Sequence, residues 1–337
     1  MTAQRVVLGI ESTAHTFGVA VLRGREVLSN VRKPYTTAKG GMIPAKVAEH
    51  HEEAVLPALR EALALAAKRG CKLGDVRLVA YSAAPGLGQA LRIGAAAAKT
   101  LALRLDAPLV PVNHCIAHLE VAALTTKATD PILLYASGAN TQVIAYDAGR
   151  YRVFGETLDT GVGNFLDTLA RHLGLGFPGG PAIERLAIAA ANGRTPRLIP
   201  LPYAVKGMDV SFAGLETHLA RIVGAHDPRD IAFSAQEHVF AMLVEVAERA
   251  MAHVGKDELA LGGGVACNAR LREMCAAMCK ARGARFFCPA AEFLVDNAAM
   301  IAWTGLIMHE RGGVSVRIRD AGIDPYERTD DVDVAWR

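Results

Sequence analysis

Residues 5–28 read RVVLGIESTAHTFGVAVLRGREVL, and this stretch decides the fold. Residues 5–10 and 17–22 are apolar runs rich in β-branched side chains, which favour strands. The polar residues 11–16 separate the two runs, and a second polar turn at 23–26 precedes another apolar pair. This order predicts a meander of three antiparallel strands.

A second copy of the meander begins near residue 131. Apolar runs at 132–135 and 141–146 flank a polar turn, and the turn at 147–150 leads into a third run. Helical and strand patterns alternate after each copy. We therefore expect an α/β protein with two lobes, built on duplicated βββαβα units, and a cleft between them. The alternative is that two unrelated meanders look alike.

The composition describes a compact globular protein. Hydrophobic residues make up 51% of the 337 residues and charged residues 21%, and the net charge is only +3. An RNA-binding surface would therefore be a local patch. No apolar run has the length of a membrane span and no secretory leader is recognisable, so we expect a cytoplasmic protein without membrane contact. The six cysteines form no C-x-x-C pair, which is typical of reduced thiols.

The segment NHCIAH at 113–118 carries the first chemical signal. It follows a short apolar run that predicts a buried strand, and it opens a helical pattern for which Asn113 is a suitable N-cap. His118 follows His114 by four positions, so both imidazoles lie on one side of the helix and can bind one divalent ion. Two histidines are only half a coordination sphere, and an ordinary helical pair is the alternative.

Glycine-rich loops at strand-to-helix junctions carry the second signal. GGG at 262–264 follows a predicted strand, and it removes the side chains that would keep a base or phosphate away from the backbone. We favour a nucleotide site there over a plain tight turn. The loop at 82–88 could bind a ligand or only turn the chain, and the Gly- and Pro-rich segment at 174–181 predicts a constrained loop.

Several helices follow from periodicity, at 44–69, 89–105, 214–224 and 229–254. Pro57 is expected to kink or split the first of them. A further helix begins near Asp296, for which an N-cap role is the simplest interpretation. The tail from residue 320 has no periodicity and is expected to be irregular.

Together these segments closely resemble the TsaD/OSGEP family of threonylcarbamoyl transferases that modify tRNA. Within it they are most similar to the archaeal and eukaryotic branch, the catalytic subunit of the KEOPS (EKC) assembly. The resemblance spans residues 9–302. Its most specific segments are HCIAH at 114–118, YASGANTQ at 135–142, GFPGGP at 176–181, SFAGLET at 211–217 and GGGVA at 262–266.

The resemblance implies an actin-like, chaperone-like and sugar-kinase-like (ASKHA) fold. Its lobes would be 1–128, completed by the helix near 296–311, and 129–325, which would contain the nucleotide and substrate site. The implied reaction transfers threonylcarbamoyl from threonylcarbamoyl-AMP to N6 of the adenosine 3′ of the anticodon in tRNAs reading ANN codons. The implied partners are tRNA, a small atypical protein kinase/ATPase and a small dimerising subunit, with a separate enzyme supplying the adenylate.

The resemblance also implies the site residues. One divalent transition metal, iron in preference to zinc, would be held by His114, His118, Tyr135 and Asp296. Glu11 and His15 are the candidate catalytic bases. The adenylate, or ATP or AMP, would contact Tyr135, Ala136, Ser137, Gly138, Ala139, Asp167, Gly180, Glu184 and Asn268.

Three departures from the family pattern stand out. Ala139 replaces a usual glycine, which we expect the site to tolerate, and Ala84 replaces another. The segment GGMIPA at 40–45 lacks the histidine and arginine of the usual GGIHPR, at Ile43 and Ala45, which puts any tRNA or partner contact there in doubt.

Three other functions compete with this reading. A metallopeptidase would need H-E-x-x-H, but Cys115 and Ile116 stand at the inner positions. A sugar or acid kinase on the same fold has no need of the histidine pair. A non-catalytic nucleotide-binding scaffold is the remaining alternative.

Overall fold

The structure is a computed structural model that describes residues 4–37 and 42–337. Its first sheet has five strands in the order β3-β2-β1-β4-β5. The strands β1 to β3 form the antiparallel meander, and β4 and β5 add to it in parallel. The bounds are β1 Val6–Glu11, β2 Thr16–Arg23, β3 Glu26–Pro34, β4 Val76–Ala84 and β5 Leu109–Asn113.

The second sheet repeats this arrangement. Its order is β12-β11-β6-β7-β8, with an antiparallel meander β6 to β8 and the parallel strands β11 and β12. The bounds are β6 Ile132–Ala136, β7 Thr141–Asp147, β8 Arg150–Glu156, β11 Glu258–Gly262 and β12 Arg285–Phe287. The duplicated architecture predicted from the sequence is therefore confirmed.

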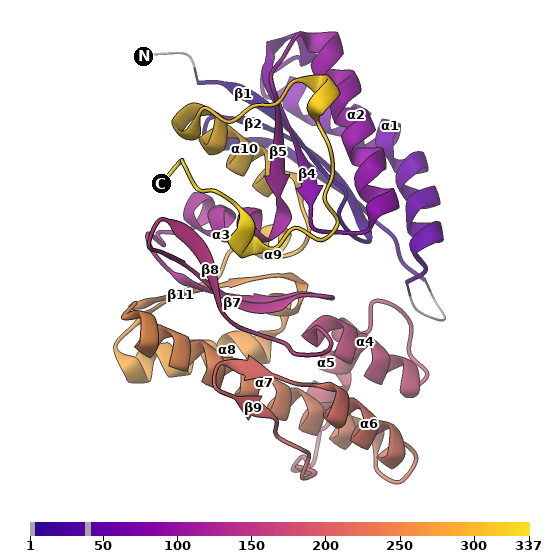
Figure 1. Cartoon of the computed structure of the whole chain (residues 1–337). Coiled ribbons are helices and arrows are strands. Elements are labelled where there is room, and N and C mark those ends of the chain that lie inside the picture. The colour runs from indigo at the N-terminus through magenta and orange to yellow at the C-terminus, as the bar shows by residue number, and fades with distance from the viewer. Residues whose placement is uncertain (1–3, 38–41) are drawn as a thin grey trace.

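Helices cover the outer face of each sheet, and a further layer of helices lies between the two sheets (Figure 1). The helices α1 (Pro44–Lys68) and α2 (Gly88–Leu105) cover the outer face of the first sheet. The helices α3 (His114–Thr125) and α10 (Ala298–Gly312) lie between the sheets. The outer face of the second sheet packs against α4 (Val162–His172), α5 (Gly180–Ala189), α6 (Ala213–Ile222), α7 (Pro228–Val254) and α8 (Ala269–Arg282).

Burial on both faces explains the continuous apolar strands. In β6, Ile132 and Leu134 face the outer helices, whereas Leu133 and Tyr135 face the middle layer. Since successive strand residues point to opposite faces, a strand covered on both sides is apolar throughout. The middle helix α3 is likewise buried at every position from His114 to Ala122, so whatever polar groups it carries must find partners inside the protein.

One sequence expectation is contradicted in part and another is wrong. Pro57 does not split α1, which is one helix of 25 residues; Pro57 lies on the exposed face, where water can satisfy the carbonyl that loses its partner. Asp296 is not the N-cap of α10. Asn297 takes that role, and its side chain accepts from Met300 N at 3.1 Å.

Some other features of the structure agree with the sequence predictions, and some were not predicted. The tail is irregular apart from short turns, and all six cysteines are free. The small hairpin of β9 (Val205–Lys206) and β10 (Asp209–Val210) and the single turn α9 (Ala291–Leu294) were not predicted. The lobe boundary at 128/129 stays a prediction, and residues 40 and 41 of the GGMIPA segment lie outside the described residues. Among the described residues, no helix is long and apolar enough to cross a membrane.

Candidate active site

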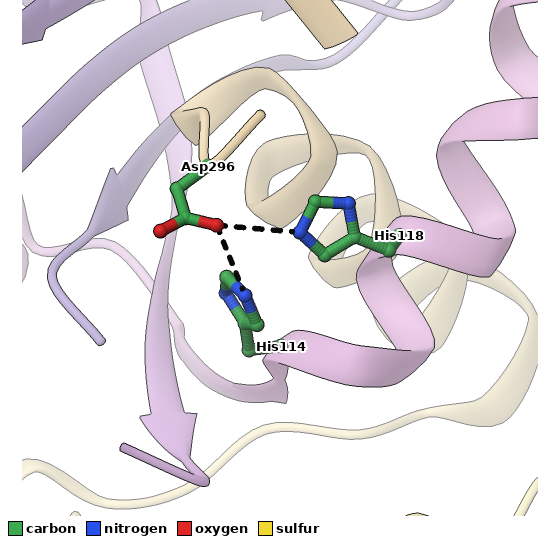
Figure 2. Close-up of side chains that lie close together, drawn as sticks. All are labelled: His114, His118 and Asp296. Carbon is green, nitrogen blue, oxygen red and sulfur yellow. Dashed lines mark ion pairs between the residues drawn. The ribbon is translucent and has the colours of Figure 1, made fainter. Parts of the chain in front are cut away.

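Three side chains converge where α3 and α10 begin. His114 Nε2 and His118 Nε2 lie 3.4 and 3.5 Å from the same oxygen, Oδ1 of Asp296. Figure 2 shows the two imidazoles one turn apart on α3. Both point at the carboxylate of Asp296, which lies in the loop before α10. One ligand atom from each residue lies within 4.8 Å of the others, as a shared metal ion requires.

Two asparagine caps set this geometry. Asn113 Oδ1 accepts from Cys115 N and Ile116 N, so α3 begins directly after β5 and presents its first turn to the site. On the opposing side, Asn297 caps α10 and also donates from Nδ2 to Val295 O at 2.8 Å. Because Asn297 supplies the cap, the carboxylate of Asp296 is free to point at the histidines.

Glu11 supports the site from β1. It is fully buried, and its Oε1 accepts from Thr13 N and Thr13 Oγ1 at 2.7 and 2.6 Å. Its Oε2 accepts from His114 Nδ1 at 3.0 Å. A carboxylate on Nδ1 keeps that nitrogen protonated, so that Nε2 of His114, which faces Asp296, is the nitrogen left to bind a metal ion. Glu11 is therefore engaged on both oxygens, and its predicted role as a catalytic base stays a prediction.

The charges of the cluster favour a bound cation. Burial disfavours the charged imidazole of His114, but Glu11 and Asp296 outweigh burial and raise its pKa well above the usual value. Burial likewise opposes ionisation of Asp296, yet the adjacent imidazoles of His114 and His118 hold its pKa well below the usual range. Burial lowers the pKa of His118, which is a neutral imidazole suited to ligation.

The donor set fits a transition metal. His118 is fully buried, and neither of its ring nitrogens has a hydrogen-bond partner among the described residues. A buried polar atom without a partner is uncommon and points to a missing ligand. Tyr135 lies beside it, with its ring centroid 4.9 Å from that of His118. Burial raises the pKa of Tyr135 well above 10, so its hydroxyl is a neutral phenol; its role as a fourth ligand stays a prediction.

The turn at 136–140 follows β6 and is held by backbone contacts. Ser137 N donates to Asn140 O, and Ser137 O and Gly138 O accept from Gly163 N and Asn164 N of α4, each at 2.9 Å. Three glycines make these close approaches possible. They are Gly161, Gly163 and Gly263. Ala139 is exposed, so its extra methyl group meets no crowded surroundings.

Replacing Gly263 with alanine is expected to lower the free energy of unfolding by about 2 kcal/mol. A Cβ there would lie 2.3 Å from Ala136 O, and its φ of +87° is unfavourable for alanine. Gly264→Ala is the matched control, because its nearest neighbour would be Val295 at 3.9 Å. Urea unfolding measures both, and equal stabilities of the two variants would contradict the close packing of this turn.

The remaining predicted nucleotide residues fall into two pairs in the second lobe. Asp167 Oδ1 on α4 accepts from Gly179 N at 2.6 Å, next to Gly180. Glu184 Oε1 on α5 accepts from Ala269 N at 2.8 Å, next to Asn268. Asn268 caps α8, and its amide donates to Gln236 Oε1 at 2.8 Å, so its side chain already has protein partners.

His15 reaches across from the first lobe. Its ring centroid lies 5.8 Å from that of Phe177 in the loop before α5. Near it the backbones of Thr37 and Phe177 pair, with Phe177 N donating to Thr37 O at 3.1 Å. Residues far apart in the sequence thus join the lobes beside the predicted adenylate loops. Two residues of the site, Thr13 and Asn297, were not predicted from the sequence. A signal for Asn297 was present, because it directly follows Asp296 and is equally suited to cap a helix.

The fold and site together define the class of protein. Two sheets of one topology, with glycine loops and a buried two-histidine, one-carboxylate cluster at their junction, form a two-lobed fold of the ASKHA type. The crystal structure of HypF from T. kodakarensis superposes with a TM-score of 0.61 at 17% identity, covering 90% of this chain and 47% of that one.

The family follows from sequence comparison. The model described as TsaD, tRNA N6-adenosine threonylcarbamoyltransferase, matches residues 26–303. The chain therefore belongs to this family, as its motifs predicted. A tRNA N6-adenosine threonylcarbamoyltransferase of Thermococcus kodakarensis is 52% identical over 333 residues, which is 98% of this chain and 99% of that protein.

A longer relative is also similar. The probable bifunctional tRNA threonylcarbamoyladenosine biosynthesis protein of Methanosarcina mazei is 48% identical over 330 residues. The match covers 98% of this chain but 59% of that protein.

Proposed function

We propose that this chain transfers threonylcarbamoyl from threonylcarbamoyl-AMP to N6 of the adenosine 3′ of the anticodon in tRNAs that read ANN codons. Family membership supports the reaction. The observation that carries the proposal for these residues is the buried cluster of His114, His118 and Asp296 directly beside β6, whose end leads into the turn at 136–140.

The proposed metal is one divalent transition ion per chain. His114, His118 and Asp296 would hold it, with Tyr135 as a further oxygen ligand. Two imidazoles and one carboxylate are the donor set used by non-haem iron sites, which favours iron, with zinc as the alternative. When bound, the metal supplies Lewis acidity toward the oxygens of the activated substrate.

The protein groups would supply binding and orientation. The backbone of the turn at 136–140 and the glycines at 262–264 would line the adenylate site. Asp167 and Glu184 accept hydrogen bonds from Gly179 N and Ala269 N beside it. The acyl phosphate is already activated, so orienting it toward N6 is a large part of the catalysis. The amine loses a proton on acylation, and His15 is the proposed acceptor because Glu11 is fully engaged.

The proposed partners follow from the reaction and the relatives. The nucleophile is a tRNA base, so tRNA is the second substrate. A relative named bifunctional, of which this chain covers 59%, supports a partner with a second activity in the same process. We propose that this partner is a small kinase/ATPase of a KEOPS-type assembly, together with a small dimerising subunit, and that the assembly is cytoplasmic.

The test uses threonylcarbamoyl-AMP labelled in its threonine. Purified chain, with and without the two partners, is incubated with an ANN-reading tRNA or with the same tRNA carrying guanosine 3′ of the anticodon. Label is expected only in the adenosine-containing tRNA. Absence of transfer with metal and partners present would overturn the proposal and leave a nucleotide-binding scaffold as the better account.

A further inference from the structure

The chain after α10 forms a strap, residues 314–337, that crosses both lobes (Figure 1). It first follows the strands of the first sheet. Val316 N donates to Leu109 O at 2.9 Å, Asp324 N donates to Ala83 O at 2.9 Å, and Tyr81 donates from its hydroxyl to Gly322 O at 2.7 Å. The strap is therefore anchored although it has almost no regular structure.

The strap then runs along α3 and contacts it at its start and near its middle. Glu327 Oε2 accepts from Asn113 Nδ2, the N-cap of α3, at 2.8 Å. Near the middle of α3, Glu120 Oε1 accepts from Trp336 Nε1 at 3.0 Å and from Arg337 Nε at 3.4 Å. Between these points Arg328 pairs with Glu156 of β8 at 3.3 Å. The strap thus holds α3 against both sheets.

Glu120 is an unusual residue for this position. It is 4% exposed on a helix whose neighbours are mostly apolar. It follows His118 by two positions, so it points to a different side of α3. Tyr151 also donates to its Oε1. A buried carboxylate requires a counter-charge and hydrogen bonds, and the nearest cation is Arg337 from the strap.

We propose that Glu120, Trp336 and Arg337 form a latch that positions α3, the helix that carries His114 and His118. The strap is the continuation of α10, at whose start Asp296 lies, and the latch joins it to α3, which carries His114 and His118. The latch therefore fixes the two ligand-bearing elements relative to each other, as the outer partners of metal ligands do. This inference rests on the metal centre of the proposed function.

The test measures metal affinity without the transfer reaction. The full chain is stripped with chelator and titrated with Co²⁺ against a competing chelator, and its visible spectrum reports the ligand geometry. Arg337→Gln is expected to weaken Co²⁺ binding about tenfold and to change the spectrum. Arg337→Lys, which restores the charge, is expected to recover most of the affinity.

Two further variants complete the design. Trp336→Phe keeps an aromatic side chain but removes the Nε1 donor and part of the buried indole. It carries the test if Arg337→Gln fails to fold, and weaker binding is expected. Asp333→Asn is the control, because its partner is Arg150, an exposed residue of β8, and wild-type affinity is expected. Wild-type affinity and spectrum in Trp336→Phe and in every folded Arg337 variant would overturn the latch alone. Absence of Co²⁺ binding by the wild type would overturn the proposed metal centre as well.

Discussion

Asp296→Ala is expected to lower threonylcarbamoyl transfer by at least about 100-fold, equivalent to about 3 kcal/mol of transition-state stabilisation. The substitution removes the oxygen that both His114 and His118 face, at 3.4 and 3.5 Å. Without it the site keeps two imidazoles but loses its anionic ligand, and metal retention should fall with activity. Steady-state transfer rates and metal content of the same preparations measure both effects.

The control for Asp296→Ala is Glu292→Gln. Glu292 lies on the neighbouring turn α9, is exposed, and loses a carboxylate charge near the site without touching the cluster. Its activity and metal content should match those of the wild type. An Asp296→Ala protein that retained full transfer, or lost transfer while keeping its metal, would show that Asp296 is not a ligand.

Glu11→Ala is expected to have the second largest effect, a loss of metal affinity of about 10- to 100-fold. Glu11 accepts from His114 Nδ1 at 3.0 Å and is fully buried. Its removal frees the imidazole to rotate or change tautomer, so that Nε2 no longer carries the lone pair toward the metal. Competition with a chelator measures the affinity directly.

The isosteric variant Glu11→Gln separates orientation from proton transfer. Glutamine still accepts from Nδ1 of His114, so metal binding should weaken less than in Glu11→Ala. If Glu11 were instead the base that removes the N6 proton, both variants would lose transfer equally while binding metal like the wild type. Glu26→Gln, a surface change in β3, serves as the control for altered net charge.

Much of the fold was predictable because its signals are local. The polar turns at 11–16 and 136–140 punctuate apolar runs, and burial on both faces makes those runs continuous. Asn113 was recognisable as a cap because a helical pattern follows it directly. The predicted split of α1 at Pro57 does not occur. Packing, and not the local sequence, decides whether a proline lies on the buried or the exposed face of a helix.

The site was predictable only in part. The spacing of His114 and His118 predicts a shared face, but nothing local separates Asp296 from Asn297 as the cap, since both residue types suit that position. The contact of Glu11 with His114 joins residues about a hundred positions apart, and so does that of Glu120 with Arg337 at twice that separation. Such contacts leave no periodic trace in the sequence.

The most direct test of the account is metal reconstitution of the transfer reaction. The wild-type protein, freed of metal by a chelator, is titrated with Fe²⁺ under anaerobic conditions, and with Zn²⁺ in parallel, while labelled threonine transfer to tRNA is followed. We predict negligible transfer by the metal-free protein, and recovery that saturates at one metal ion per chain in the wild type but not in Asp296→Ala. Full transfer by the metal-free wild type would contradict the account.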